Sequence, residues 1–100
     1  MNMQQMMAQA QKMQRELRKA QAELAEKEFV VTKGGAVSVT LLGNKEIKSI
    51  KIDKDAFDPD NKEMIEDMIA LAINEAMEQI DQEKDAIEER ITGQRGGFGF

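Results

Sequence analysis

The sequence has 100 residues, the length of a single domain, and its 41% hydrophobic residues are enough for a modest core. It contains no Cys, which excludes a disulfide framework and a thiolate zinc site, and it has no His, Tyr or Trp. The net charge of −5 is unevenly spread: residues 1–54 carry 10 Lys or Arg against 6 Asp or Glu, whereas residues 55–91 carry 3 against 13.

Residues 3–27 are predicted to form a helix. Apolar residues recur there at four- and three-residue spacings, and Gln, Ala, Glu, Lys and Arg fill most other positions. The helix would be roughly 36 Å long. Its apolar stripe consists of Met6, Ala10, Met13, Leu17, Ala20 and Leu24.

Residues 28–52 are predicted to form three strands of an antiparallel meander. The segments EFVVTK and AVSVTLL are rich in β-formers and are separated by Gly34–Gly35, a turn signal. Gly43–Asn44 predicts a two-residue hairpin turn with Gly first. In EIKSIKID the alternation of apolar and polar residues slips, which predicts a β-bulge near Lys48–Ser49.

A second helix is predicted to begin within DPDNKE and to end near residue 91. Asp58 followed by Pro59 fits an N-cap with Pro at the first helical position. Asp60 with Glu63 three residues later offers a competing capping box.

Both predicted helices are longer than the sheet, because a strand of seven residues spans only about 23 Å. The excess is expected to project as helical arms, at the N-terminus of the first helix and the C-terminus of the second. The apolar stripe would then pack on the second helix, on a partner chain, or on both. We expect residues 1–92 to form a single domain and residues 93–100 to be a flexible Gly-rich tail.

The chain offers no candidate catalytic group. Without His and Cys, the usual general base and the thiol nucleophile are missing. The segment DKDAFDPDNKE lacks the central Gly and the terminal Glu of a calcium loop, and no phosphate-binding Gly-rich loop is present. We therefore expect no enzymatic activity, no cofactor, no metal and no small-molecule substrate.

No apolar run approaches the roughly 20 residues that a membrane span needs. The opening MNMQQMMAQAQK also lacks the basic start and the continuous apolar stretch of a signal peptide. These features predict a cytoplasmic protein with no membrane partner.

Four cations lie opposite the apolar stripe of the first helix: Lys12, Arg15, Arg18 and Lys19. At 100° per residue they fall between about 140° and 260° from Met13. They could be a solvated helix face, or they could attract the acidic half of the fold. Their position on a projecting arm favours contact with the phosphates of duplex DNA. Single-strand recognition is disfavoured, because side chains able to stack on bases are almost absent.

Both faces of the predicted sheet carry apolar residues. Phe29 and Val31 lie on one face, and Val30 and Leu42 lie on the other. One helix cannot cover two faces, and an exposed apolar patch of that size is unusual on a monomer. The pattern therefore predicts a homodimer, which would double the four cations to eight.

The chain resembles the YbaB/EbfC family of bacterial nucleoid-associated proteins. The likeness runs over nearly the whole chain, through MNMQQMMAQAQKMQREL, GGAVSVTLLGNKEIKSIKID, NKEMIEDMIALAINEA and the tail GGFGF. The resemblance implies a helix–three strands–helix protomer, a homodimer with projecting helical arms, and DNA binding in the nucleoid without enzymatic activity. It attributes DNA contact to the arms, which adds Lys84 and Arg90 on the second arm as weaker candidates, because acidic residues surround them.

We therefore predict an α+β homodimer that binds duplex DNA through its helical arms, mainly by electrostatic contact with the backbone. The alternative is a small protein–protein interaction module with no nucleic-acid role. The acidic half of the chain supports that alternative, because it repels phosphate.

Overall fold

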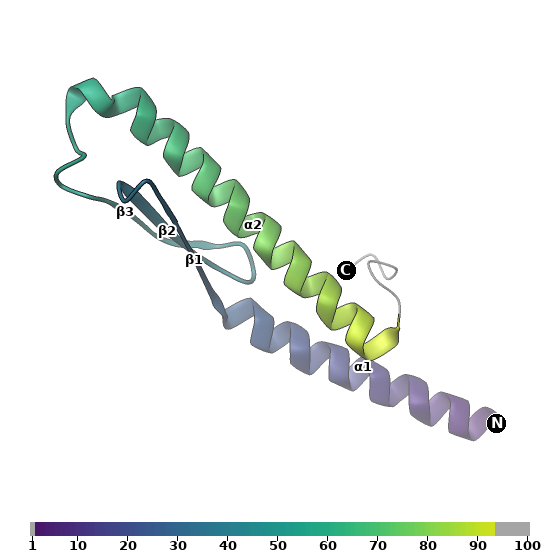
Figure 1. Ribbon diagram of the computed structural model, residues 1–100. Helices are drawn as coiled ribbons and strands as arrows, with labels where there is room; N and C mark the ends of the chain where they lie inside the picture. Colours follow the sequence, from purple (N-terminus) through teal and green to yellow (C-terminus); the bar gives the residue numbers. More distant parts are fainter. Residues whose placement is uncertain (1, 94–100) are drawn as a thin grey trace.

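The computed structural model describes residues 2–93. The molecule is elongated, with dimensions of 69 × 19 × 16 Å. Its α+β order of helix, three-stranded antiparallel sheet and long helix is the predicted one (Figure 1). The predicted tail lies, except for Gly93, outside the described residues. The elements are α1 (Met3–Glu26), β1 (Glu28–Lys33), β2 (Val37–Leu42), β3 (Ile47–Ile52), the 3-10 turn η1 (Pro59–Asn61) and α2 (Lys62–Thr92).

The start and the end of α2 follow the local sequence. The Asp58 side chain accepts a hydrogen bond of 2.8 Å from the Asp60 N–H, and Pro59 begins η1. The predicted cap and proline therefore belong to the 3-10 turn that leads into α2, and α2 itself begins at Lys62. Asn61 is the N-cap of α2 and makes no side-chain capping bond, so the competing capping box is not the one used. At the other end Gly93 has φ 77°, a left-handed conformation that glycine adopts without a Cβ penalty, and it ends the helix as predicted.

The second hairpin differs from the prediction. Its loop spans residues 43–46, and the residue with positive φ is Lys45 rather than Gly43. Glycine is needed at position 43 for a different reason: a Cβ there would lie 1.7 Å from the Leu24 carbonyl oxygen in the last turn of α1. The Gly43 N–H donates a 2.9 Å hydrogen bond to the Lys27 carbonyl oxygen. The loop is therefore shaped by its contact with the end of α1.

The predicted bulge in β3 is confirmed. Thr40 of β2 is opposite Ser49, and Leu41 is opposite Ile47, so Lys48 is the extra residue. The insertion brings Ile47 to the sheet face that also carries Ile50, since each successive strand residue otherwise alternates between faces.

The core lies between the sheet and α2, which runs across β1 and β2 (Figure 1). Strand β3 is not covered by α2. Its residues Ile47 and Ile50 are therefore each 44% exposed. The opposite face of the sheet is mostly polar, although Val30 is 57% exposed there. Val30 and half-buried Leu42 lie on that face as predicted, and a further uncovered apolar surface lies beside α2, on the core face of the sheet. The buried core consists of Leu24, Phe29, Val31, Ala36, Val37, Val39, Leu41, Ile65, Ala72, Ala76 and Ile80.

Beyond the sheet, α1 and the C-terminal part of α2 lie side by side (Figure 1). We call α1 together with residues 80–92 the two-helix segment. Leu17 and Ala20 are buried in it, and Met13 is half-buried beside Ile91. These contacts hold the apolar stripe of α1 against α2, so the polar residues of α1 face water.

Candidate nucleic-acid interface

Near the sheet, five Lys residues form ion pairs with acidic side chains, whereas Lys51 and Lys54 are exposed and form none within residues 2–93. Two of the ion pairs join the sheet or its loops to α2, and another joins the end of α1 to α2. A cation held in such a pair is partly neutralised by its carboxylate, so it attracts an external anion less strongly than an unpaired cation does. The five pairs are Lys27–Glu83 (2.6 Å), Lys33–Glu75 (2.8 Å), Lys45–Asp81 (2.8 Å), Lys62–Glu66 (3.1 Å) and Lys48–Glu28.

The four cations predicted on α1 are in a different condition. Lys12, Arg15, Arg18 and Lys19 are all exposed, and no ion pair or hydrogen bond engages them within residues 2–93. They are held at fixed positions on a helix whose opposite side is packed. The contrast with the paired cations could not be seen in the sequence, because every pair except Lys62–Glu66 joins residues at least 20 positions apart in the chain.

The structure brings part of the predicted set together with α2. Lys19 and Arg90 line one hollow of about 300 Å³ between the helices. Lys12 lines a neighbouring hollow that shares Ile91 with it, so these three cations occupy one flank of the two-helix segment. Glu16 lies among them, which makes this flank mixed in charge.

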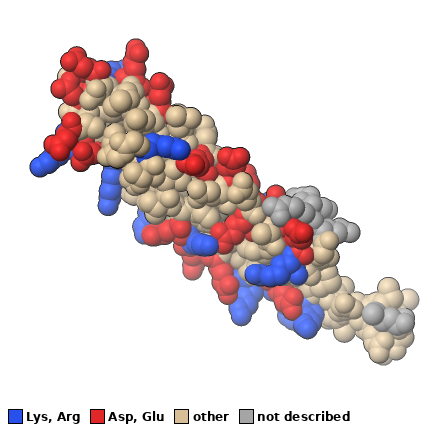
Figure 2. Space-filling view, in the orientation of Figure 1, with Lys and Arg blue, Asp and Glu red and all other residues tan. Residues whose placement is uncertain are grey.

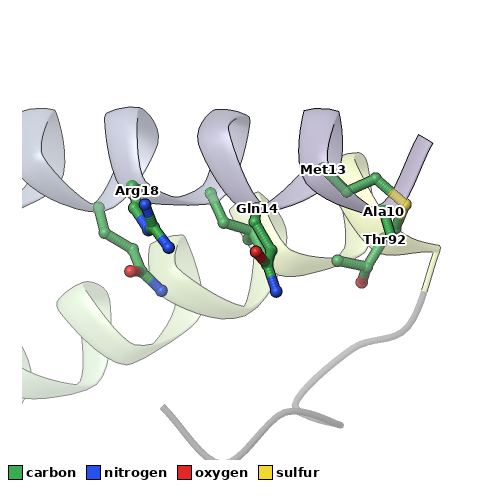
Figure 3. Close-up of a pocket in the computed structure, with 7 residues that line it drawn as sticks. Ala10, Met13, Gln14, Arg18 and Thr92 are labelled. Atoms are coloured by element: carbon green, nitrogen blue, oxygen red, sulfur yellow. The ribbon is translucent and has the colours of Figure 1, made fainter. Parts of the chain in front are cut away.

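Arg18 faces the other flank. There it lines a groove of about 490 Å³ together with Gln14 of α1 and Thr92 of α2 (Figure 3). Arg15 has a helical position between those of Arg18 and Lys19, on the outer side of α1. The four cations therefore spread around the outer half of α1 instead of forming one compact patch.

The two candidates on α2 have different outcomes. Arg90 is exposed and lies beside Lys19, as the arm hypothesis requires. Lys84 is half-buried and lies about 120° around the helix from Arg90, because six residues separate them. Of the acidic residues near Arg90, Glu83 is bound to Lys27 and Glu88 is only 2% exposed.

The N-terminal end of α1 was incompletely anticipated. Residues 2–11 carry no charge, and Met3, Met6 and Met7 are 76%, 58% and 57% exposed. Met6 belongs to the predicted stripe but has nothing to pack on within the described protomer, because α2 ends at Thr92, near Ala10. Figure 2 shows this uncharged tip in tan, blue side chains mixed with red over the two-helix segment, and mostly red at the opposite end.

The described residues offer little for other kinds of chemistry. Within residues 2–93, no group of three or more His, Cys, Asp or Glu is placed to hold a metal ion. In the same range, none of the helices combines the length and the apolar character that crossing a membrane requires. The feature that stands out is the set of unpaired cations, which suits an anionic polymer.

Comparison with known proteins gives one consistent result. Residues 1–95 match the YbaB/EbfC DNA-binding family. A nucleoid-associated protein of Clostridium novyi is 48% identical over 94 residues, covering 93% of this chain and 82% of that protein. One from Agathobacter rectalis is 47% identical over 100 residues, covering 99% and 88%. A crystal structure of an uncharacterized Helicobacter pylori protein shares the fold, with a TM-score of 0.74 at 19% identity, over 90% of this chain and 96% of that one.

Proposed function

Because the chain belongs to the YbaB/EbfC DNA-binding family, we propose that it binds duplex DNA in the bacterial nucleoid as a homodimer and has no enzymatic activity. The two-helix segment contacts the DNA, mainly through phosphates. The residues that carry this contact are Lys12, Arg15, Arg18, Lys19 and Arg90, with Lys84 as the weakest member.

The observation that supports this assignment is the division of the cations into two groups. Five Lys residues are held by acidic partners, whereas the four exposed cations of α1 have none within the described residues. Lys51 and Lys54 near the sheet are unpaired as well, but the α1 cations are the larger set, lie along one helix and have Arg90 of α2 beside Lys19. An unpaired cation loses no protein contact when it meets a phosphate, and it releases the counterion condensed there. Binding of this kind is strong in low salt and weakly dependent on base sequence, because phosphates position a protein without specifying bases.

A homodimer is supported by the apolar surface beside α2. Ile47 and Ile50 of β3 are exposed, and Ile69, Ile73 and Met77 of α2 are half-buried at the margin of the core. We call this surface the β3 shelf. A helix from a second protomer could cover β3 as α2 covers β1 and β2, which would bury the shelf on both chains. The dimer would carry two copies of every cation named above.

The experiment that tests DNA binding compares two charge variants of equal size. Arg15→Glu with Lys19→Glu changes the proposed contact, whereas Lys51→Glu with Lys54→Glu makes the same change in net charge on the sheet side. Both pairs are exposed, so the fold should persist, which circular dichroism can verify.

Fluorescence anisotropy with a labelled duplex should show weaker binding by the first variant, to all sequences alike, and smaller loss by the second. The proposal fails if the first variant binds as tightly as the parent. An equal loss in both variants would mean that net charge alone drives binding, without a defined contact surface.

A further inference from the structure

A second uncovered apolar face lies on α2, on the side away from the β3 shelf. Met64 is 41% exposed and Leu71 is 59% exposed. They are seven residues apart and so lie on the same side of the helix. Met68 lies between them and is half-buried, since its Cε atom lies close to Gly34. We call the surface around Met64 and Leu71 the outer α2 face.

This face is bordered by acidic side chains. Asp67 and Glu78 fall on the same side of α2 as Leu71, are exposed, and take part in no ion pair within residues 2–93. The surrounding segment is also acidic, because residues 53–67 carry seven Asp or Glu against two Lys. An occupant of this face has to combine apolar side chains with positive charge.

The N-terminal end of α1 has that combination. Met3 and Met7 are exposed on one side of α1, and Arg18 follows on the same side, since eleven residues make about three turns. Arg15 is exposed next to it. Met3 to Arg18 spans roughly 22 Å, and Met64 to Glu78 spans roughly 21 Å at the same rise per residue. The two strips are therefore similar in length and opposite in charge.

We propose that the outer α2 face binds the N-terminal end of α1 from another copy of this chain. Met3 and Met7 pack against Met64 and Leu71, which places Arg15 and Arg18 at the level of Glu78. Asp67, between Met64 and Leu71, adds to the negative charge of the face. The two surfaces lie toward opposite ends of a molecule 69 Å long. A head-to-tail contact produces linear assemblies when the rotation between neighbours does not close a ring. The contact between α1 and the outer α2 face leaves the β3 shelf free, so this contact can join one homodimer to the next.

This contact needs no DNA and so goes beyond the proposed function. Arg15 and Arg18 would serve in both contacts, so duplex DNA and the linear assembly would compete for α1. In the absence of DNA the contact combines an apolar patch with ion pairs, which salt screens because the charges lie at the surface.

Sedimentation velocity without DNA tests the proposal in the full-length protein. At several hundred micromolar protein and low salt, we expect species larger than the smallest closed unit. In about 1 M salt, where the screening length is about 3 Å, the protein should return to that unit. Two variants reverse the charge at one end each: Arg15→Glu with Arg18→Glu, and Asp67→Lys with Glu78→Lys.

Each variant alone should stay at the smallest unit, because its two ends then repel. An equal mixture should restore the larger species, since the reversed α1 of one variant matches the reversed α2 of the other. Lys51→Glu with Lys54→Glu is the control and should assemble like the parent. The proposal is overturned if the parent never exceeds the smallest unit, or if the mixture fails to assemble while both variants are folded by circular dichroism.

The DNA-binding measurement separates this proposal from the proposed function. Asp67→Lys with Glu78→Lys leaves every proposed DNA contact intact, so it should bind a labelled duplex at least as well as the parent at dilute concentration. If the Asp67→Lys with Glu78→Lys variant loses assembly and keeps DNA binding, both proposals stand. If the parent protein assembles but binds no DNA, only the proposed function fails.

Discussion

The contact between the second hairpin and the end of α1 can be tested with Gly43→Ala. A Cβ at this position would lie 1.7 Å from the Leu24 carbonyl oxygen and 2.6 Å from its carbonyl carbon. Both are backbone atoms of the last turn of α1, so no side-chain rotation relieves the overlap. The hairpin and the helix would have to separate.

The cost of that separation follows from the contacts it disturbs. The Gly43 N–H donates to the Lys27 carbonyl oxygen at 2.9 Å, and the Asn44 N–H donates to the Ala25 carbonyl oxygen at 3.3 Å. Each of the two hydrogen bonds contributes about 0.5–1.5 kcal/mol, and forcing packed atoms apart costs about 1–3 kcal/mol. We expect the free energy of unfolding to fall by about 2–6 kcal/mol, and Tm to fall by at least about 8 °C in a domain of this size.

Urea denaturation followed by circular dichroism measures this change. The protein concentration has to be the same for each variant, because self-association shifts the midpoint. Gly35→Ala is the matched control: residue 35 has φ 66°, and a Cβ there would meet nothing within 4 Å. The control should lose only the left-handed penalty of about 1–2 kcal/mol. If Gly43→Ala destabilises no more than Gly35→Ala, the close approach is not a determinant of the fold.

Three further predictions concern binding, assembly and the C-terminal segment. A plot of log affinity for duplex DNA against log salt concentration should have a slope of roughly −4 to −7, because each of two protomers would neutralise two to four phosphates and each phosphate contributes about −0.9. A slope near zero would contradict contact with the DNA backbone. In dilute protein at about 1 M salt, where the head-to-tail contact is screened, Ile47→Lys with Ile50→Lys should give a folded monomer of 11.3 kDa in sedimentation, because only a partner would bury these half-exposed side chains. Thr32→Lys on the opposite sheet face should associate like the parent, and a double variant that also sediments like the parent would exclude the β3 shelf as the interface. Ending the chain at Gly93 should leave Tm within about a degree or two, because Gly-rich sequence buries little apolar surface and is costly to order, and a larger drop in a thermal scan would show that residues 94–100 stabilise the fold.

The local sequence was sufficient for the elements and several of their ends. The helix with the four-three spacing of the α1 stripe and the turn at Gly34–Gly35 lie where they were predicted, and Asp58–Pro59 begins the 3-10 turn that leads into α2. Even the bulge at Lys48 was visible, because a slip in a two-residue alternation has to be absorbed within the strand. These features depend on residues within a few positions of one another, so the sequence alone determines them.

Other features were decided only by how the elements pack. The role of Gly43 depends on the end of α1 passing over the hairpin, and the exposure of Ile47 depends on α2 covering β1 and β2 but not β3. Met6 has the same spacing as Leu17, yet it stays exposed because α2 ends at Thr92. Charge shows the same division, since the sequence located every cation, whereas the fold determined which of them lie close enough to an acidic side chain to be paired.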